Sequence, residues 1–120
     1  MIKYQGKILS IGPLVEDFKQ AGILVFFGED APDELLEFSI IHDAKDLKEP
    51  LAIGDNVSIN HEKFRVLAVG DVANTNLSNL GHLILKFNGD DTARLPGDVN
   101  LEEKPIPEIW VGMEIKIEKA

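Results

Sequence analysis

The sequence consists of short apolar segments, rich in Ile, Val, Leu and Phe, that alternate with Gly, Asn, Asp and Pro. Short apolar segments between turn residues are typical of β-strands, and no regular alternation of strands with long helices is present. The strands that the pattern predicts cover residues 2–11, 22–27, 35–42, 56–60, 64–69, 82–87, 98–101 and 113–118. Many short strands of this kind favour a mainly β fold, as a small closed or partly closed barrel, with a sandwich as the second choice.

One segment has a clear helical pattern, NTNLSNLG at residues 74–81. Asn74 can cap its first turn, and Gly81 can end it in the left-handed conformation. A helical turn at residues 31–38 (APDELLEF) competes with the start of the third strand, because Pro32 could occupy a first helical position with acids behind it. We therefore expect one short helix near 74–81.

Two segments share a pattern of apolar residues around a glycine: LAIGDNVSI at 51–59 and IWVGMEIKI at 109–117. In each, the glycine can make a turn from which a strand begins. A repeated turn of this kind is a recurrent device in small barrels and needs no duplication of the chain.

Length, charge and composition restrict the function. With 120 residues the chain suits one domain, residues 1–120, and its net charge of −9 argues against a nucleic-acid partner. The absence of cysteine removes disulfides, thiolate metal sites and cysteine nucleophiles. No apolar run approaches the roughly 20 residues of a membrane span, and no signal-peptide pattern occurs, so we expect a cytoplasmic protein without membrane insertion.

The three histidines differ in their sequence context. Strand alternation puts His42 on the core-facing side with Ile40, and the charged run that follows predicts a ring at the rim of the core with solvent above it. His82 begins a strand on the face opposite to that of Leu83, and His61 is expected at the tip of a hairpin. From pattern alone, each ring has a simple structural explanation: packing, closing a junction or solvation.

The sequence lacks the common patterns of other chemistries. No histidine is paired with a second ligand at the spacing of a metal site, so no metal and no cofactor are predicted. No serine lies between glycines on a nucleophile turn, and no phosphate-binding glycine loop is present.

Three motifs together resemble a known family. They are VGDVANTNLSNLGH at 69–82, IIHD at 40–43 and LPGDV at 95–99. The chain is similar over essentially its whole length to the glucitol/sorbitol-specific enzyme IIA component of the bacterial phosphoenolpyruvate-dependent sugar phosphotransferase system.

The resemblance implies a cytoplasmic phosphotransferase component without a cofactor. Such carriers accept a phosphoryl group from phospho-HPr on a histidine and pass it to the sugar-specific IIB component of the membrane permease during glucitol/sorbitol uptake. It implies that His42 is the phosphohistidine, and His82 is expected nearby as a residue that stabilises the phosphoryl group. Lys86 could offset charge, and Asp43 could orient the unphosphorylated ring.

A second class of function remains open at this point. A small acidic β-barrel could bind a protein or a sugar without catalysing any transfer, with His42 and His82 as structural residues.

Overall fold

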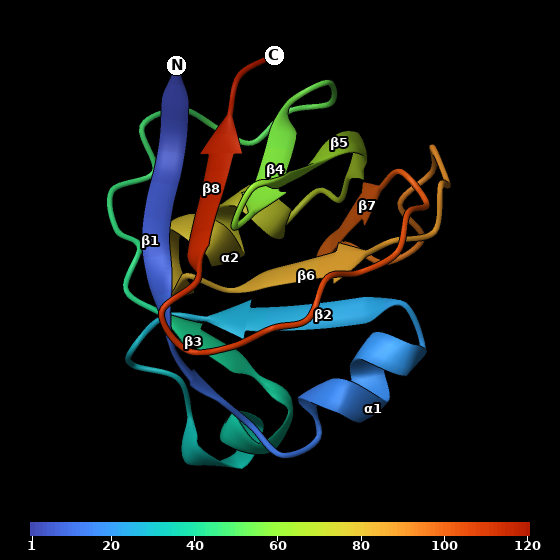
Figure 1. Ribbon diagram of the computed structural model, residues 1–120. Helices are drawn as coiled ribbons and strands as arrows, with labels where there is room; N and C mark the ends of the chain where they lie inside the picture. The colour runs from blue at the N-terminus through green and yellow to red at the C-terminus, as the bar shows by residue number, and fades with distance from the viewer.

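Eight strands close into a barrel in the computed structural model, which describes residues 1–120 (Figure 1). The strands are β1 (Ile2–Ile11), β2 (Ile23–Phe27), β3 (Ile40–His42), β4 (Asn56–Ile59), β5 (Glu62–Val69), β6 (Leu83–Lys86), β7 (Asp98–Leu101) and β8 (Glu114–Glu118). Around the barrel their order is β1-β3-β2-β6-β7-β5-β4-β8. The mainly β barrel expected from the sequence is confirmed, and the sandwich is wrong.

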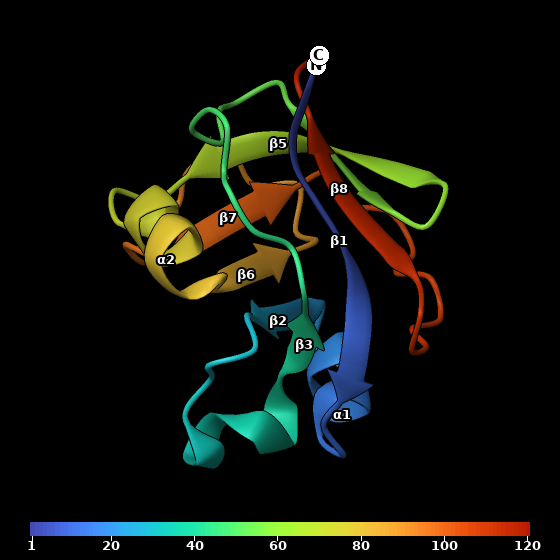
Figure 2. The ribbon, with the colours of Figure 1, turned by 90° about the vertical axis from the view of Figure 1, so that its left-hand side faces the viewer.

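The long strand β1 closes the barrel. Its first part pairs with β8 and its last part with β3, both antiparallel, with an irregularity in register between Ile8 and Ser10. Only β2–β3 and β6–β7 pair in parallel. The two ends of the chain lie together at one end of the molecule (Figures 1 and 2), where the Lys119 N–H donates to the Met1 carbonyl.

Alternation along the strands divides their side chains between two clusters. Leu24 and Phe26 of β2 point into the barrel and belong to a core of 22 buried residues. Val25 and Phe27 of the same strand point outward and pack with Ile41 in a second, smaller cluster. Both faces of β2 are therefore buried, as its unbroken apolar sequence indicates.

Two helices and one 3₁₀ helix accompany the barrel: α1 (Val15–Gln20), η1 (Asp33–Phe38) and α2 (Ala73–Leu80). The expected helix near 74–81 is confirmed as α2, which lies at the ends of β6 and β7 (Figure 2) and buries Leu77 in the core. The cap expected of Asn74 is wrong, because Asn74 lies inside the helix and its side chain bonds the Leu51 backbone. None of the helices is long and apolar enough to cross a membrane.

The prediction of only one helix is wrong, as is the strand predicted over 35–42. Residues Asp33–Phe38 form η1, the alternative that Pro32 indicated, and the strand is reduced to Ile40–His42. The unpredicted helix α1 and η1 cover the outer cluster, where the rings of Phe18 and Phe38 stack at 5.3 Å. This contact between distant segments stabilises two elements too short to form alone.

The two similar glycine segments form the same turn. Gly54 and Gly112 both have φ of +94°, and the turns are closed by bonds from the Asp55 N–H to the Ala52 carbonyl and from the Met113 N–H to the Trp110 carbonyl. A positive φ at the third turn position requires glycine in a type II turn. The turns precede β4 and β8, which are neighbours in the barrel.

One ion pair of the fold is almost completely buried. The Lys3 ammonium lies 2.7 Å from a carboxylate oxygen of Asp55, with 4% and 5% of the two side chains exposed, and also donates to the Pro50 carbonyl at 2.8 Å. It ties β1 to the turn before β4. Such a pair contributes little net stability when intact, but removal of one partner leaves a buried charge without compensation.

We therefore expect Lys3→Met to lower the free energy of unfolding by about 3–5 kcal/mol. Lys116→Met is the control, because the Lys116–Glu118 pair is partly exposed and its loss should cost about 1 kcal/mol or less. Urea unfolding of both variants measures the difference. Equal losses of unfolding free energy in the two variants would show that burial does not make the Lys3–Asp55 pair more costly to break.

Candidate functional site

His42 is the last residue of β3 and points into one end of the barrel. Its ring packs edge-on against Tyr4 at 5.7 Å and at a tilt against Phe26 at 6.3 Å, as the predicted inward face requires. The residue is 1% exposed. The expectation of a ring open to solvent at the rim is therefore wrong, because the distant Gly81 packs against the ring in addition to Tyr4 and Phe26.

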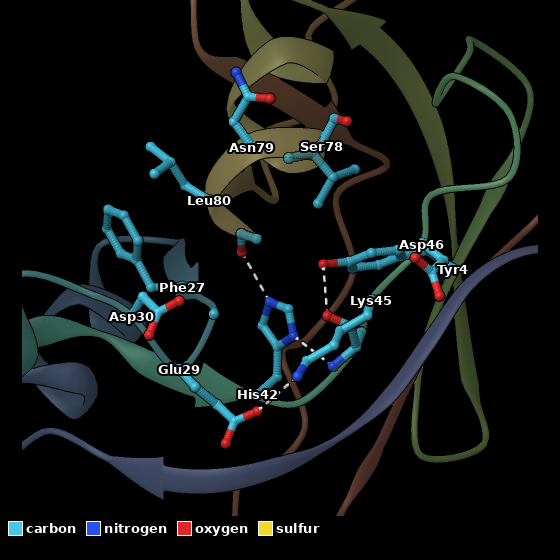
Figure 3. A pocket seen from close by; sticks show the side chains of 14 residues that line it. Tyr4, Phe27, Glu29, Asp30, His42, Lys45, Asp46, Ser78, Asn79 and Leu80 are labelled. Carbon is cyan, nitrogen blue, oxygen red and sulfur yellow. Dashed lines mark hydrogen bonds and ion pairs between the residues drawn. The ribbon is translucent and has the colours of Figure 1, made fainter.

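Both ring nitrogens of His42 have backbone partners (Figure 3). Nε2 lies 2.8 Å from the Gly81 carbonyl oxygen, and the Ala44 N–H donates to Nδ1 at 3.1 Å. A carbonyl can only accept, and an N–H can only donate, so the pattern fits a neutral imidazole that carries its proton on Nε2. The site therefore holds one tautomer and one ring orientation.

Burial lowers the pKa of His42 below its ordinary value of 6.5. The hydrogen bond to the Gly81 carbonyl and the carboxylates of Asp43 and Glu29 act in the opposite direction and offset part of the effect. The neutral ring is thus the dominant form at neutral pH. The adjacent Tyr4 hydroxyl donates to the Ala44 carbonyl at 3.1 Å, and burial raises the pKa of Tyr4 to about 12, which keeps this donor protonated.

A cavity of about 460 Å³ opens beside His42 (Figure 3). Its walls come from four separate parts of the chain: Tyr4 of β1, the end of β2 with the loop after it, His42 with the segment after β3, and the last turn of α2 with Gly81. The lining residues are Tyr4, Phe27, Gly28, Glu29, Asp30, His42, Ala44, Lys45, Asp46, Leu77, Ser78, Asn79, Leu80 and Gly81. Buried side chains, among them His42 and Leu77, lie at its floor, and the exposed charged side chains of Glu29 and Lys45 lie at its mouth. This arrangement suits a group that is approached from outside.

Two glycines bring the walls of this cavity together. The Gly28 N–H donates to the Leu80 carbonyl at 2.9 Å, and Gly81 ends α2 with φ of +63°. A Cβ on Gly81 would lie 2.8 Å from the Gly28 nitrogen and 3.0 Å from Cε1 of His42. Glycine is therefore required here both for the left-handed turn and for the approach of the carbonyl to the imidazole.

The structure does not bring His82 into the cavity with His42. The His82 ring lies on the outer face of the barrel, stacked on Phe27 at 4.0 Å, and its Nδ1 lies 3.1 Å from the Phe26 carbonyl. Because a carbonyl oxygen only accepts, Nδ1 donates this bond and is not available as the donor expected for a phosphoryl group. His82 instead connects the start of β6 to the end of β2, directly beside Gly81.

Other predicted residues also lie outside the cavity. Lys86 points outward and pairs with the buried Asp98 at 2.9 Å, and an Asp43 oxygen accepts the Lys7 N–H at 2.7 Å. His61 is exposed in the turn between β4 and β5, as expected. The charge-offsetting role expected of Lys86 is therefore not supported by its position.

The cationic side chain in the cavity is Lys45, which the sequence reasoning overlooked. Its ammonium lies 3.6 Å from a Glu29 oxygen at the mouth, where Asp30 and Asp46 add two more acids. The position of Lys45, three residues after His42, could have indicated a cation near the ring. It lies within a charged run whose pattern is typical of a solvated surface.

Comparison with known proteins decides the family. Residues 3–116 match the family model described as PTS system glucitol/sorbitol-specific IIA component, where PTS denotes the phosphotransferase system. The chain belongs to this family. The resemblance carried by residues 40–43, 69–82 and 95–99 is thereby confirmed.

Relatives of this IIA family match along nearly the whole chain. The PTS system glucitol/sorbitol-specific EIIA components of Shigella flexneri and of Escherichia coli K12 are each 38% identical over 118 residues, which is 98% of this chain and 95% of the relative. The crystal structure of a PTS system IIA component from Enterococcus faecalis V583 superposes with a TM-score of 0.81 at 26% identity, over 95% of this chain and 98% of that one. The barrel is thus shared with a structure of the same component type.

We expect Gly81→Ala to destabilise the protein and to displace His42. The new methyl group adds a steric conflict with Gly28 and His42 to the cost of a left-handed alanine. Gly22→Ala is a matched control, since Gly22 also has a positive φ, +82°, with nothing within 4 Å of the added carbon. The control should lose about 1–2 kcal/mol of unfolding free energy, and Gly81→Ala at least about 1 kcal/mol more.

Urea unfolding measures the two costs, and the imidazole NMR signals of His42 report its displacement. Equal costs with unchanged His42 signals would show that the Gly81 carbonyl does not hold the ring.

The lowered pKa of His42 makes stability depend on pH in a defined direction. As pH falls below 6.5, the unfolded chain binds a proton at His42 while the folded chain still resists it, so the free energy of unfolding falls. The His42→Gln variant has no group that titrates at this position, so its free energy of unfolding should fall less than that of the wild type between pH 7 and pH 5. Urea unfolding of both proteins across this range measures it, and parallel curves would contradict the burial-lowered pKa.

Proposed function

We propose that this IIA component is a cytoplasmic phosphocarrier that uses His42. It accepts a phosphoryl group from phospho-HPr and passes it to the IIB component of the permease during glucitol/sorbitol uptake. The observation that carries the proposal is a neutral imidazole, fixed in one tautomer, at the floor of an open cavity in a chain of this family.

Neutral imidazole suits a relay because it is both a nucleophile and a leaving group. A lone pair of the His42 ring forms a bond to phosphorus as the nitrogen–phosphorus bond of the donor breaks, and that electron pair returns to the donor ring. The proton that the His42 ring gives up passes, directly or through water, to the donor ring. In the onward step a nucleophile of IIB attacks the phosphorus as the nitrogen–phosphorus bond of His42 breaks, the electron pair returns to the His42 ring, and the ring regains a proton. No oxidant is needed.

The ring must exchange one of its hydrogen bonds to react. Because the proton is on Nε2, the lone pair lies on Nδ1, and attack through Nδ1 releases the Ala44 N–H, which can then donate to a phosphoryl oxygen. Attack through Nε2 requires that its proton first leave the Gly81 carbonyl and that the ring take the other tautomer. Because His42 is 1% exposed, partner docking must also widen the mouth of the cavity. Docking and ring release are therefore coupled in the proposed mechanism.

The surroundings of His42 support transfer rather than hydrolysis. Tyr4 and Phe26 exclude water from the inner side of the ring, and Leu80, 51% exposed, offers an apolar contact at the mouth. The acids Glu29 and Asp46 give the rim a negative charge that attracts a basic partner surface and speeds its encounter.

His82 has a positioning role in this proposal. Its bond to the Phe26 carbonyl and its stacking on Phe27 hold the end of β2 against the segment that carries Gly81. It thus acts on His42 through the backbone, without touching the phosphoryl group.

His42→Ala should abolish labelling by phosphoenolpyruvate, enzyme I and HPr, because His42 is the one histidine that lines the cavity. His61→Ala is the matched control and should be labelled normally, since His61 lies at an exposed turn. Peptide mapping of an acid-labile, alkali-stable phosphate identifies the site. A wild-type protein that takes up no phosphate would instead favour a binding module, and a label on His82 would reverse the roles.

A further inference from the structure

The cavity mouth contains one cation beside three acids. Lys45 is the sole lysine or arginine among the lining residues, whereas Glu29, Asp30 and Asp46 are acidic. A phosphoryl group carries close to two negative charges at neutral pH, so placing it on His42 brings it into a predominantly negative environment. Lys45 is the side chain that can offset this repulsion.

Lys45 is held near His42 by a weak interaction. Its ammonium lies 3.6 Å from Glu29, and the two side chains are 74% and 49% exposed. Figure 3 shows the pair meeting from opposite edges of the cavity, beside the His42 ring. The Glu29 carboxylate is also close enough to His42 to affect its pKa. An exposed pair of this kind stabilises by about 1 kcal/mol or less, so Lys45 can leave Glu29 at little cost.

The other lysines near this part of the fold are committed or turned away. Lys3 is buried against Asp55 and Lys86 pairs with Asp98 on the outer face. Neither Lys7, which is next to Asp43 across β1, nor Lys48 lines the cavity. A flexible ammonium with a replaceable carboxylate partner is suited to exchange one anion for another.

We propose that Lys45 exchanges Glu29 for the phosphoryl group when His42 is phosphorylated, and so sets the stability of the phosphorylated state. Glu29 competes with the phosphoryl group for Lys45: it binds the lysine in the unphosphorylated protein and repels the phosphoryl group in the phosphorylated protein. This inference rests on the proposed phosphorylation of His42. It adds a residue that contacts the transferred group, and no bond is made or broken in the exchange itself.

The equilibrium of transfer from phospho-HPr separates this role from docking. An equilibrium constant depends only on the free and phosphorylated end states, so a lysine that merely contacts the donor protein would change rates alone. The experiment measures both the initial rate and the final ratio of phosphorylated to free protein at a fixed ratio of phospho-HPr to HPr.

Lys45→Ala should lower both quantities about tenfold, less than the loss for a buried donor because Lys45 is exposed. Lys45→Arg should restore most of the effect, since the charge is kept. Glu29→Gln should raise the equilibrium ratio by freeing the lysine and removing a repelling charge. Lys48→Ala, an exposed lysine outside the cavity, is the control and should match the wild type.

The outcomes distinguish the two levels of the proposal. If Lys45→Ala and Glu29→Gln weaken transfer equally, the pair is a structural link and the exchange is refuted. A change in rate without a change in equilibrium would make Lys45 a docking residue and also refute it. Absence of label on His42 in the wild-type protein would refute the proposed function itself, independently of Lys45.

Discussion

Closure of the barrel by β1 is the constraint on which the site depends. Because this one strand pairs with β8 at its start and with β3 at its end, it must bend, and its register with β3 changes between Ile8 and Ser10, where Ile8 faces His42. The bend carries β3, only three residues long, across one end of the barrel. Because β3 lies between β1 and β2 in the closed barrel, one of its faces points to the core, and His42 on that face points toward α2.

The environment of His42 reconciles burial with reactivity. Buried polar groups are costly unless they are hydrogen-bonded, and here the backbone of Gly81 and Ala44 satisfies both ring nitrogens without introducing another charge. Burial of the neutral ring therefore costs little, whereas protonation of the buried ring is unfavourable, and the ring stays neutral. The same backbone contacts fix the tautomer of the imidazole. The charged groups of this site lie at the mouth of the cavity instead.

Much of the fold follows from local sequence, and most of the site does not. Alternation correctly puts Ile40 and His42 inside, and glycine chemistry correctly ends α2. The helix α1 has few apolar residues and no side-chain cap, and η1 depends on Phe18 from elsewhere, so local pattern could not identify them. The cavity joins Tyr4, residues 27–30, His42 with residues 44–46, and residues 77–81, whose meeting depends on closure of the barrel. The sequence nevertheless predicts the position of the His82 ring, because strand alternation puts His82 on the face opposite to that of the buried Leu83. Its nearness to Gly81 in sequence led instead to the expectation of a place beside His42.

The acidic mouth has a physical rationale in a relay. A site lined with cations would bind the phosphoryl group strongly in its resting state, and that stabilisation would have to be lost again when the group moves on. In the proposed carrier, the carboxylates of Glu29 and Asp46 would raise the free energy of the phosphorylated state, and the exposed Lys45 ammonium would lower it only in part. Because these groups are exposed, their contributions are small and adjustable, and they act without altering the tautomer that the buried contacts impose. In the proposed carrier, therefore, the barrel interior determines that His42 can react, and the charges at the mouth determine how far transfer proceeds.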